Sequence, residues 1–155
     1  MLNELFSAFD RLAATHGLEK IKTIGDAYMV VGGIPQPRAD HAAAITRMGL
    51  DMQDAIASYA TRTGSDLTIR IGIHSGSIVA GVIGENKFIY DLWGDTVNTA
   101  SRMESAGVAG RVHVSEATAA DLRDHFELEA RGPVEIKGKG LMSTFLVGVR
   151  PAPTA

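Results

Sequence analysis

The chain has 155 residues, 45% of them hydrophobic, and a formal net charge of −3, which fits a single folded domain. The slight acidic excess argues against a nucleic-acid-binding domain, which usually carries a basic surface. The lack of cysteine excludes disulfides, thiolate zinc sites and cysteine-held iron–sulfur clusters. No apolar run approaches the roughly 18 residues of a membrane span, so we expect a cytoplasmic domain without membrane or nucleic-acid contact in this chain.

The first half of the chain predicts two helices with a hairpin between them. Apolar residues recur at helical spacing over Leu2–His16, and Gly17 ends the pattern. Two short strand-like runs, Glu19–Ile24 and Ala27–Val31, are joined by a Gly-Asp pair, which is typical of a hairpin turn. A long helix with one apolar stripe is expected over about residues 39–61.

The second half predicts mainly strands, with two helices among them. Residues 67–73 alternate apolar and polar side chains, which indicates a strand covered on one side. Asp95 has the position of an N-cap for a helix ending near residue 106, and Ser115 that of an N-cap for a helix ending near residue 125. Further strands are expected at 78–83, 88–92, 112–114, 126–130, 134–137 and 144–149.

These elements together predict an α+β fold in which helices pack on an antiparallel-rich sheet. The helix-first order indicates a split βαβ, ferredoxin-like arrangement that is incomplete at its N-terminus, because the leading strand is not in the sequence. Residues 1–150 are assigned to one domain and residues 151–155 to a frayed tail.

Two segments carry residue types that suit chemistry on phosphates. Asp26 lies on the predicted hairpin turn, where its carboxylate suits Mg²⁺, although a turn aspartate bonded to its own backbone fits the same pattern. Asn98 and Arg102 are spaced i, i+4 near a helix start, an arrangement that favours anions. A surface salt bridge is the simpler role for Arg102. The five histidines are never spaced i, i+3 or i, i+4, so we expect structural or solvent-facing roles for them.

The chain resembles the class III nucleotidyl cyclase catalytic domain in four motifs, which are Lys22–Asp26, Arg70–Gly76, Asp91–Arg102 and Val134–Gly140. The motifs stand in the order and spacing of that family, and the resemblance extends to about Val149. It implies an enzyme of signal transduction that converts a nucleoside triphosphate to its 3′,5′-cyclic monophosphate and pyrophosphate. It also implies a head-to-tail homodimer with the sites at the interface.

The resemblance implies roles for the metal-binding and base-reading residues. Asp26 is similar to the aspartate that binds two catalytic ions, Mg²⁺ or Mn²⁺. Lys22 and Asp91 are similar to the pair that reads the base. A lysine can donate to adenine N1 and an aspartate can accept from the exocyclic amine, whereas guanine presents the opposite pattern. The pair therefore indicates ATP as the substrate and an adenylyl cyclase as the enzyme.

The resemblance also implies roles for residues that meet the sugar and the phosphates. Asn98 would orient the ribose, and Arg102 would stabilise charge on the α-phosphate in the transition state. Lys137 is similar to the lysine that holds the terminal phosphates, and Lys139 is the weaker candidate. Asp26 of one subunit would act with these residues of its partner, so a monomer would lack a complete site.

The sequence departs from the family pattern at its start. Family members begin with a strand that carries a first metal aspartate and a Phe-rich turn, and neither precedes Met1 here. We therefore expect residues 1–155 alone to be weak or inactive, and to be monomeric, weakly associated or strand-swapped. A non-catalytic partner or regulatory module is the alternative function. A purely structural domain is disfavoured by the six matching site residues.

Overall fold

The computed structural model describes residues 2–34, 36–77, 79–83, 89–136 and 138–151, without the side chains of 2, 79–83, 89–93 and 149–151. In chain order the described elements are α1 (Leu2–His16), β1 (Glu19–Ile24), β2 (Ala27–Val31), α2 (His41–Thr63), β3 (Ile71–Ile73), β4 (Val79–Ile83), β5 (Ile89–Trp93), α3 (Asp95–Ser105), β6 (Val112–Ser115), α4 (Glu116–Leu122), β7 (Phe126–Ile136) and β8 (Gly140–Pro151).

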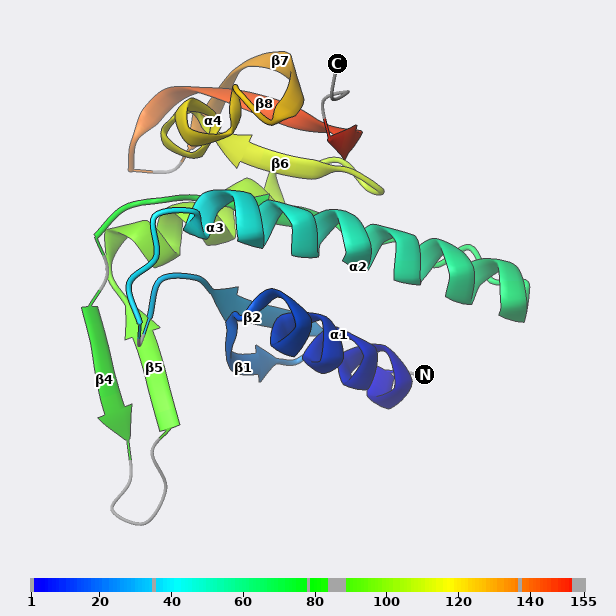
Figure 1. The fold of residues 1–155 in the computed structure, drawn as a ribbon. Helices are drawn as coiled ribbons and strands as arrows, with labels where there is room; N and C mark the ends of the chain where they lie inside the picture. Colours follow the sequence, from blue (N-terminus) through cyan, green and yellow to red (C-terminus); the bar gives the residue numbers. More distant parts are fainter. Residues whose placement is uncertain (1, 35, 78, 84–88, 137, 152–155) are drawn as a thin grey trace.

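Helix α2 lies at the centre of the molecule, between two layers (Figure 1). On one side is a four-stranded sheet of order β3-β6-β8-β7, with α4 packed against it. On the other side α1 packs with the antiparallel hairpin β1-β2, and the hairpin β4-β5 projects from one end. Two hydrophobic clusters lie between these layers, one between α2 and the sheet and one between α2 and α1.

The structure confirms the predicted elements at the start of the chain. Helix α1 and strands β1 and β2 have the predicted limits. Gly17 and Gly25, with φ of 68° and 59°, adopt the left-handed backbone that ends the helix and makes the hairpin turn. The limits of these elements are predictable because glycines, which adopt a positive φ readily, stand where the turns require it.

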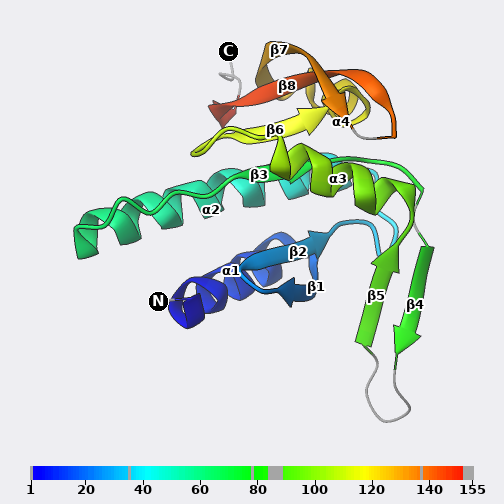
Figure 2. The ribbon, with the colours of Figure 1, turned by 180° about the vertical axis from the view of Figure 1, so that it is seen from behind.

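The predicted strand over residues 67–73 is shorter than expected. Only β3, Ile71–Ile73, pairs with a neighbour, and its partner β6 is parallel. Leu67 and Ile69 are half-buried against the cluster around α1 and α2 without being part of the sheet. The other face is not open either, because a Cβ on Gly72 would lie 2.0 Å from the backbone nitrogen of Glu104. Helix α3 therefore covers the face of β3 that was expected to be free (Figure 2).

The C-terminal half differs from prediction at α3, α4, β7 and β8. Asp95 is the first residue of α3 rather than its cap, because Gly94 occupies the N-cap position with φ of 115°. Helix α4 ends at Leu122, three residues before the expected end. The strands expected at 126–130 and 134–137 are one strand, β7. Its pairing with β8 continues across Gly132, with a shift in register between Ala130 and Gly132. Strand β8 includes Pro151, and residues 152–155 lie outside the described part.

Within the described residues, no helix combines the length and the apolar character that crossing a membrane requires.

Candidate active site

Helix α3 carries the two polar residues predicted to act on the substrate. Its buried face holds Thr99 and Met103, which are 2% and 0% exposed. Asn98 and Arg102 are exposed and line the same hollow, which confirms that the i, i+4 spacing puts them on one face. The absence of a side chain at Gly72 lets the backbone of α3 rest directly on β3. This close approach sets where the exposed face points.

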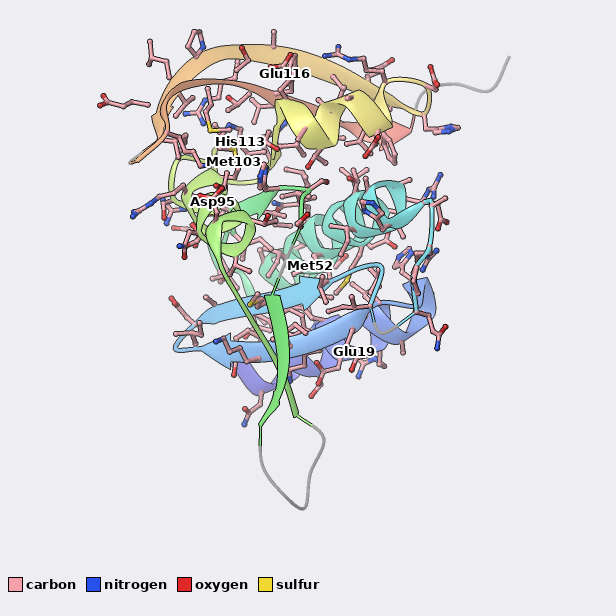
Figure 3. The ribbon with its side chains drawn as sticks, turned by 90° about the vertical axis from the view of Figure 1, so that its left-hand side faces the viewer. Glu19, Met52, Asp95, Met103, His113 and Glu116 are labelled. Atoms are coloured by element: carbon pink, nitrogen blue, oxygen red, sulfur yellow. The ribbon has the colours of Figure 1, made fainter. Side chains whose placement is uncertain are left out.

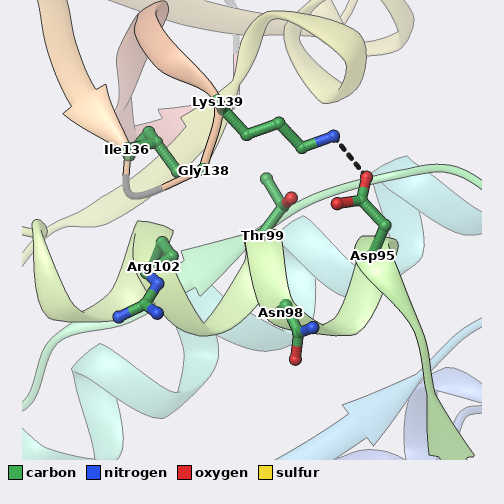
Figure 4. Close-up of a pocket in the computed structure, with 7 residues that line it drawn as sticks. All are labelled: Asp95, Asn98, Thr99, Arg102, Ile136, Gly138 and Lys139. Atoms are coloured by element: carbon green, nitrogen blue, oxygen red, sulfur yellow. Dashed lines mark hydrogen bonds and ion pairs between the residues drawn. The ribbon is translucent and has the colours of Figure 1, made fainter.

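A hollow of about 250 Å³ lies between α3 and the turn that joins β7 to β8 (Figure 4). The turn contributes Lys139 and Gly138, which are separated in sequence from α3 by more than thirty residues and meet it only through the fold. The hollow is lined by Asp95, Asn98, Thr99, Arg102, Ile136, Gly138 and Lys139. It thus combines two cationic groups, one carboxylate and one amide, a set that can bind a polyanion and orient a hydroxyl.

The two cations of the hollow differ in their partners. The Lys139 ammonium donates to the Asp95 carboxylate, with 2.5 Å between Nζ and Oδ2. Both side chains reach solvent, at 36% and 68% exposure. Among the described residues no carboxylate pairs with Arg102, so the surface salt bridge considered for it is not formed with any of them. Arg102 thus lines the hollow without an ion-pair partner among these residues.

The hairpin places Lys22 and Asp26 on a separate element. Asp26 is exposed at the turn between β1 and β2, and among the described residues nothing bonds to its carboxylate. The expected alternative, a bond to its own turn, is therefore not formed. Lys22 is half-buried on β1, which lies against β5, the strand of Asp91. The side chain of Asp91, and Lys137 as a whole, lie outside the described residues.

A tie to α1 holds the hairpin in place. The Tyr28 hydroxyl on β2 donates to Asp10 of α1 with 2.7 Å between the oxygens, and the Lys20 ammonium lies 3.3 Å from the same carboxylate. Burial, together with the bond to Asp10, raises the pKa of Tyr28. The rings of Phe6 and Phe9 pack against Tyr28. These contacts connect α1 to the element that carries Lys22 and Asp26.

Two histidines near α3 have the structural roles that the sequence predicted, but their partners could not be read from it. Burial lowers the pKa of His74 and of His113, which favours the neutral form of both rings. His74 bonds to the buried hydroxyl of Ser115, with 2.6 Å between Nδ1 and Oγ. His113 contacts the carbonyl of Met103. Their spacing in sequence gives no signal, because each partner comes from a distant element.

A metal ion would have to draw on few protein ligands. In the part of the chain that the structure describes, no group of three or more His, Cys, Asp or Glu residues gathers. Mg²⁺ takes only one or two carboxylates where substrate phosphates complete its shell. The unbonded carboxylate of Asp26 fits one such ligand position.

Comparisons with known proteins show which family the chain belongs to. The family model described as the adenylate and guanylate cyclase catalytic domain matches residues 1–148. The chain is 47% identical over 152 residues to an adenylate cyclase of Mycobacterium tuberculosis, covering 97% of this chain and 34% of that protein. It is 46% identical over 149 residues to the guanylate cyclase soluble subunit beta-2 of Rattus norvegicus, covering 95% of this chain and 22% of that protein. Its structure matches the guanylate cyclase domain of RhGC from Catenaria anguillulae, solved in complex with GTP, with a TM-score of 0.88, 42% identity, and coverage of 96% of this chain and 82% of that chain.

The chain therefore belongs to the adenylate and guanylate cyclase catalytic domain family, that is, the class III nucleotidyl cyclases. The expected α+β cyclase fold is confirmed. The chain spans about a third or less of the length of these two relatives. Because these relatives include both an adenylate and a guanylate cyclase, the family match does not determine whether the substrate base is adenine or guanine.

Proposed function

We propose that this domain converts ATP to 3′,5′-cyclic AMP and pyrophosphate, by attack of the ribose 3′-hydroxyl on the α-phosphate. The observation that carries the proposal is the hollow in which Asn98 and Arg102 of α3 meet Lys139 of the β7–β8 turn. A hollow lined by two cations favours a triphosphate, and the amide of Asn98 offers a donor and an acceptor to a sugar hydroxyl.

Arg102 has the chemistry to stabilise the transition state. As the 3′-oxygen attacks, negative charge builds up on the oxygens of the α-phosphate, and a guanidinium already in place lowers the barrier without reorganising. Its lack of a carboxylate partner among the described residues supports this role, because none of those residues neutralises its charge. Asn98, one helical turn earlier, would hold the ribose so that its 3′-hydroxyl faces the phosphorus.

A lysine on the β7–β8 turn would hold the terminal phosphates. The resemblance favours Lys137, which lies outside the described residues, whereas Lys139 lines the hollow. The matched variants Lys137→Ala and Lys139→Ala distinguish the two, since the lysine that contacts the phosphates raises the KM for the nucleotide when it is removed. We expect Lys139→Ala to have the smaller effect, because Lys139 is shared with Asp95.

The base would be read by Lys22 and Asp91. Strand β1 lies against β5, which supports a joint role for these two residues on one side of the domain. A buried polar group left without its partner by the wrong base costs far more than a small misfit of shape. The double substitution Lys22→Glu with Asp91→Cys should lower kcat/KM for ATP and raise it for GTP. An unchanged ATP:GTP ratio would show that these residues do not select the base.

Asp26 is the residue of this chain that would bind divalent cations, Mg²⁺ or Mn²⁺. The bound cation would supply Lewis-acid activation of the 3′-hydroxyl and charge neutralisation at the phosphates. The described lining of the hollow does not include Asp26. This separation supports a site shared by two copies of the chain in a head-to-tail dimer, with Asp26 of one copy facing the hollow of the other.

Mixing two inactive variants tests the shared site. In a random mixture of Asp26→Ala and Arg102→Ala subunits, half of the dimers combine both, and each of these has one intact site of two. Activity should therefore recover to about a quarter of wild type, by the logic of a two-fold interface. Mixtures no more active than either parent, despite demonstrated heterodimers, would contradict a shared site.

The deciding experiment measures turnover of ATP and GTP, with Mn²⁺, by the complete natural protein. Arg102→Ala should lower kcat by about 10²–10³-fold, the range for loss of one preorganised transition-state donor. Arg11→Ala is the matched control, because Arg11 is an exposed arginine on α1, away from the hollow. If wild type binds nucleotide but turns none over, the domain is a non-catalytic partner module. If both variants retain activity within twofold of wild type, Arg102 has no catalytic role.

A further inference from the structure

The C-terminal end of α3 is held by basic side chains from three different parts of the sheet layer. His113 on β6 contacts the carbonyl of Met103, and Arg131 on β7 donates to the carbonyl of Ala106. Arg70, just before β3, donates to the carbonyl of Ser105 with 3.4 Å between the atoms. The last carbonyls of a helix lack partners within the helix and accept from these donors, and the two arginine cations are favoured at that end of the helix dipole. These three contacts therefore fix the position of the last turn.

The His113 ring joins two of the three contacts. Its Nδ1 lies 2.8 Å from the Met103 oxygen and must donate, because a carbonyl can only accept. Its Nε2 is then the acceptor of the neutral ring, and Arg131 Nη1 lies 3.4 Å away to donate to it. His113 is fully buried, and Figure 3 shows it beside Met103 where β6 meets α3. One ring thus links β7, β6 and α3 in a single arrangement.

The register of the sheet places this ring against the helix. His113 pairs with Gly72 across the parallel strands β6 and β3, so the two residues lie side by side beneath α3. Gly72 lets the helix approach, and His113 donates to the residue that follows Arg102 in the chain. The contact between His113 and the Met103 carbonyl thus acts on the helical turn that carries Arg102.

We propose that His113 and Arg131 are positioning residues for Arg102, a proposal that rests on the function proposed above. A side-chain tip lies about 6 Å from the axis of its helix, so a rotation of α3 by about 10° moves the tip by about 1 Å. A displacement of that size in a group that acts on the transition state can cost about 10²-fold in rate. His113 and Arg131 hold the rotation and the axial position of α3 within that tolerance.

The test is a double-mutant cycle in the complete protein. His113→Leu removes both hydrogen bonds, and Arg131→Met removes the exposed partner with little risk to folding. Each should lower kcat by about 10–100-fold and leave the KM for the nucleotide within about twofold. In an Arg102→Ala background the same substitutions should cause less than a twofold further loss, because the group they position is absent. His113→Gln, whose amide can still donate and accept, should restore part of the activity.

The matched control is Val114→Ala, one residue along β6. Val114 is fully buried, but it belongs to the cluster around α2 and α4 rather than to the contacts of α3. It should lower stability without changing kcat where the protein is folded.

The outcomes separate the two proposals. If Arg102→Ala itself leaves kcat unchanged, the proposed function fails. If Arg102→Ala lowers kcat but His113→Leu or Arg131→Met lowers it equally in both backgrounds, the positioning role is wrong. Should His113→Leu fail to fold, Arg131→Met alone decides.

Discussion

Gly72→Ala tests how closely α3 must approach the sheet. A Cβ at this position would lie 2.0 Å from the Glu104 backbone nitrogen and 2.5 Å from the Met103 carbonyl carbon. Both are backbone atoms, so no side chain can turn aside, and α3 must move by at least about 1 Å to reach a 3.0 Å separation. Overpacking of this kind costs about 1–3 kcal/mol of stability. Displacing the Arg102 guanidinium by about 1 Å should lower kcat by about 10²-fold.

The assay combines urea unfolding with steady-state kinetics on Gly72→Ala and on the control Gly49→Ala. Gly49 is buried, whereas Gly72 is half-buried, and a Cβ on Gly49 would meet Val112 Cγ2 at 3.4 Å, an ordinary contact. Because Gly49 lies inside α2, its replacement should leave stability unchanged or raise it by up to about 1 kcal/mol, with kcat unaffected. If Gly72→Ala keeps kcat within twofold of wild type, the close packing of α3 does not control the site.

Two further predictions follow from the charges around α3. Asp95→Asn should free Lys139 for the substrate and lower the KM for the nucleotide by up to about fivefold, since an exposed ion pair is worth about 0–1 kcal/mol. A higher KM would mean that Asp95 itself helps to bind the nucleotide. The free energy of unfolding should be highest above pH 6.5 and fall as the pH drops below it. Burial lowers the pKa of His74 and of His113 in the folded state, whereas the rings of the unfolded chain take up protons near pH 6.5. Urea midpoints at pH 7.5 and 5.5 measure this loss, and it should shrink in His113→Gln; an equal loss in that variant would contradict the assignment to His113.

Local signals in the sequence were enough for some elements and not for others. The hairpin limits were predictable because Gly25 supplies the positive φ that its turn requires. The run of residues 67–73 misled because alternation reports burial, and Leu67 and Ile69 are partly buried against the cluster around α1 and α2 rather than by pairing in a sheet. At the start of α3, Gly94 takes the N-cap position. The Asp95 carboxylate, which was expected to cap the helix, instead accepts from Lys139, a residue distant in sequence.

The sequence by itself determined the family, the α+β class and the face of α3 that carries Asn98 and Arg102, because residue identities and helical spacing are local properties of the chain. The tertiary structure decided which groups share the hollow and what holds them there. Lys139 reaches α3, and His113 reaches the Met103 carbonyl, only after the strands have paired. Contacts between residues so far apart in the chain depend on how β3, β6, β7 and β8 are ordered and registered, and no local pattern encodes that order.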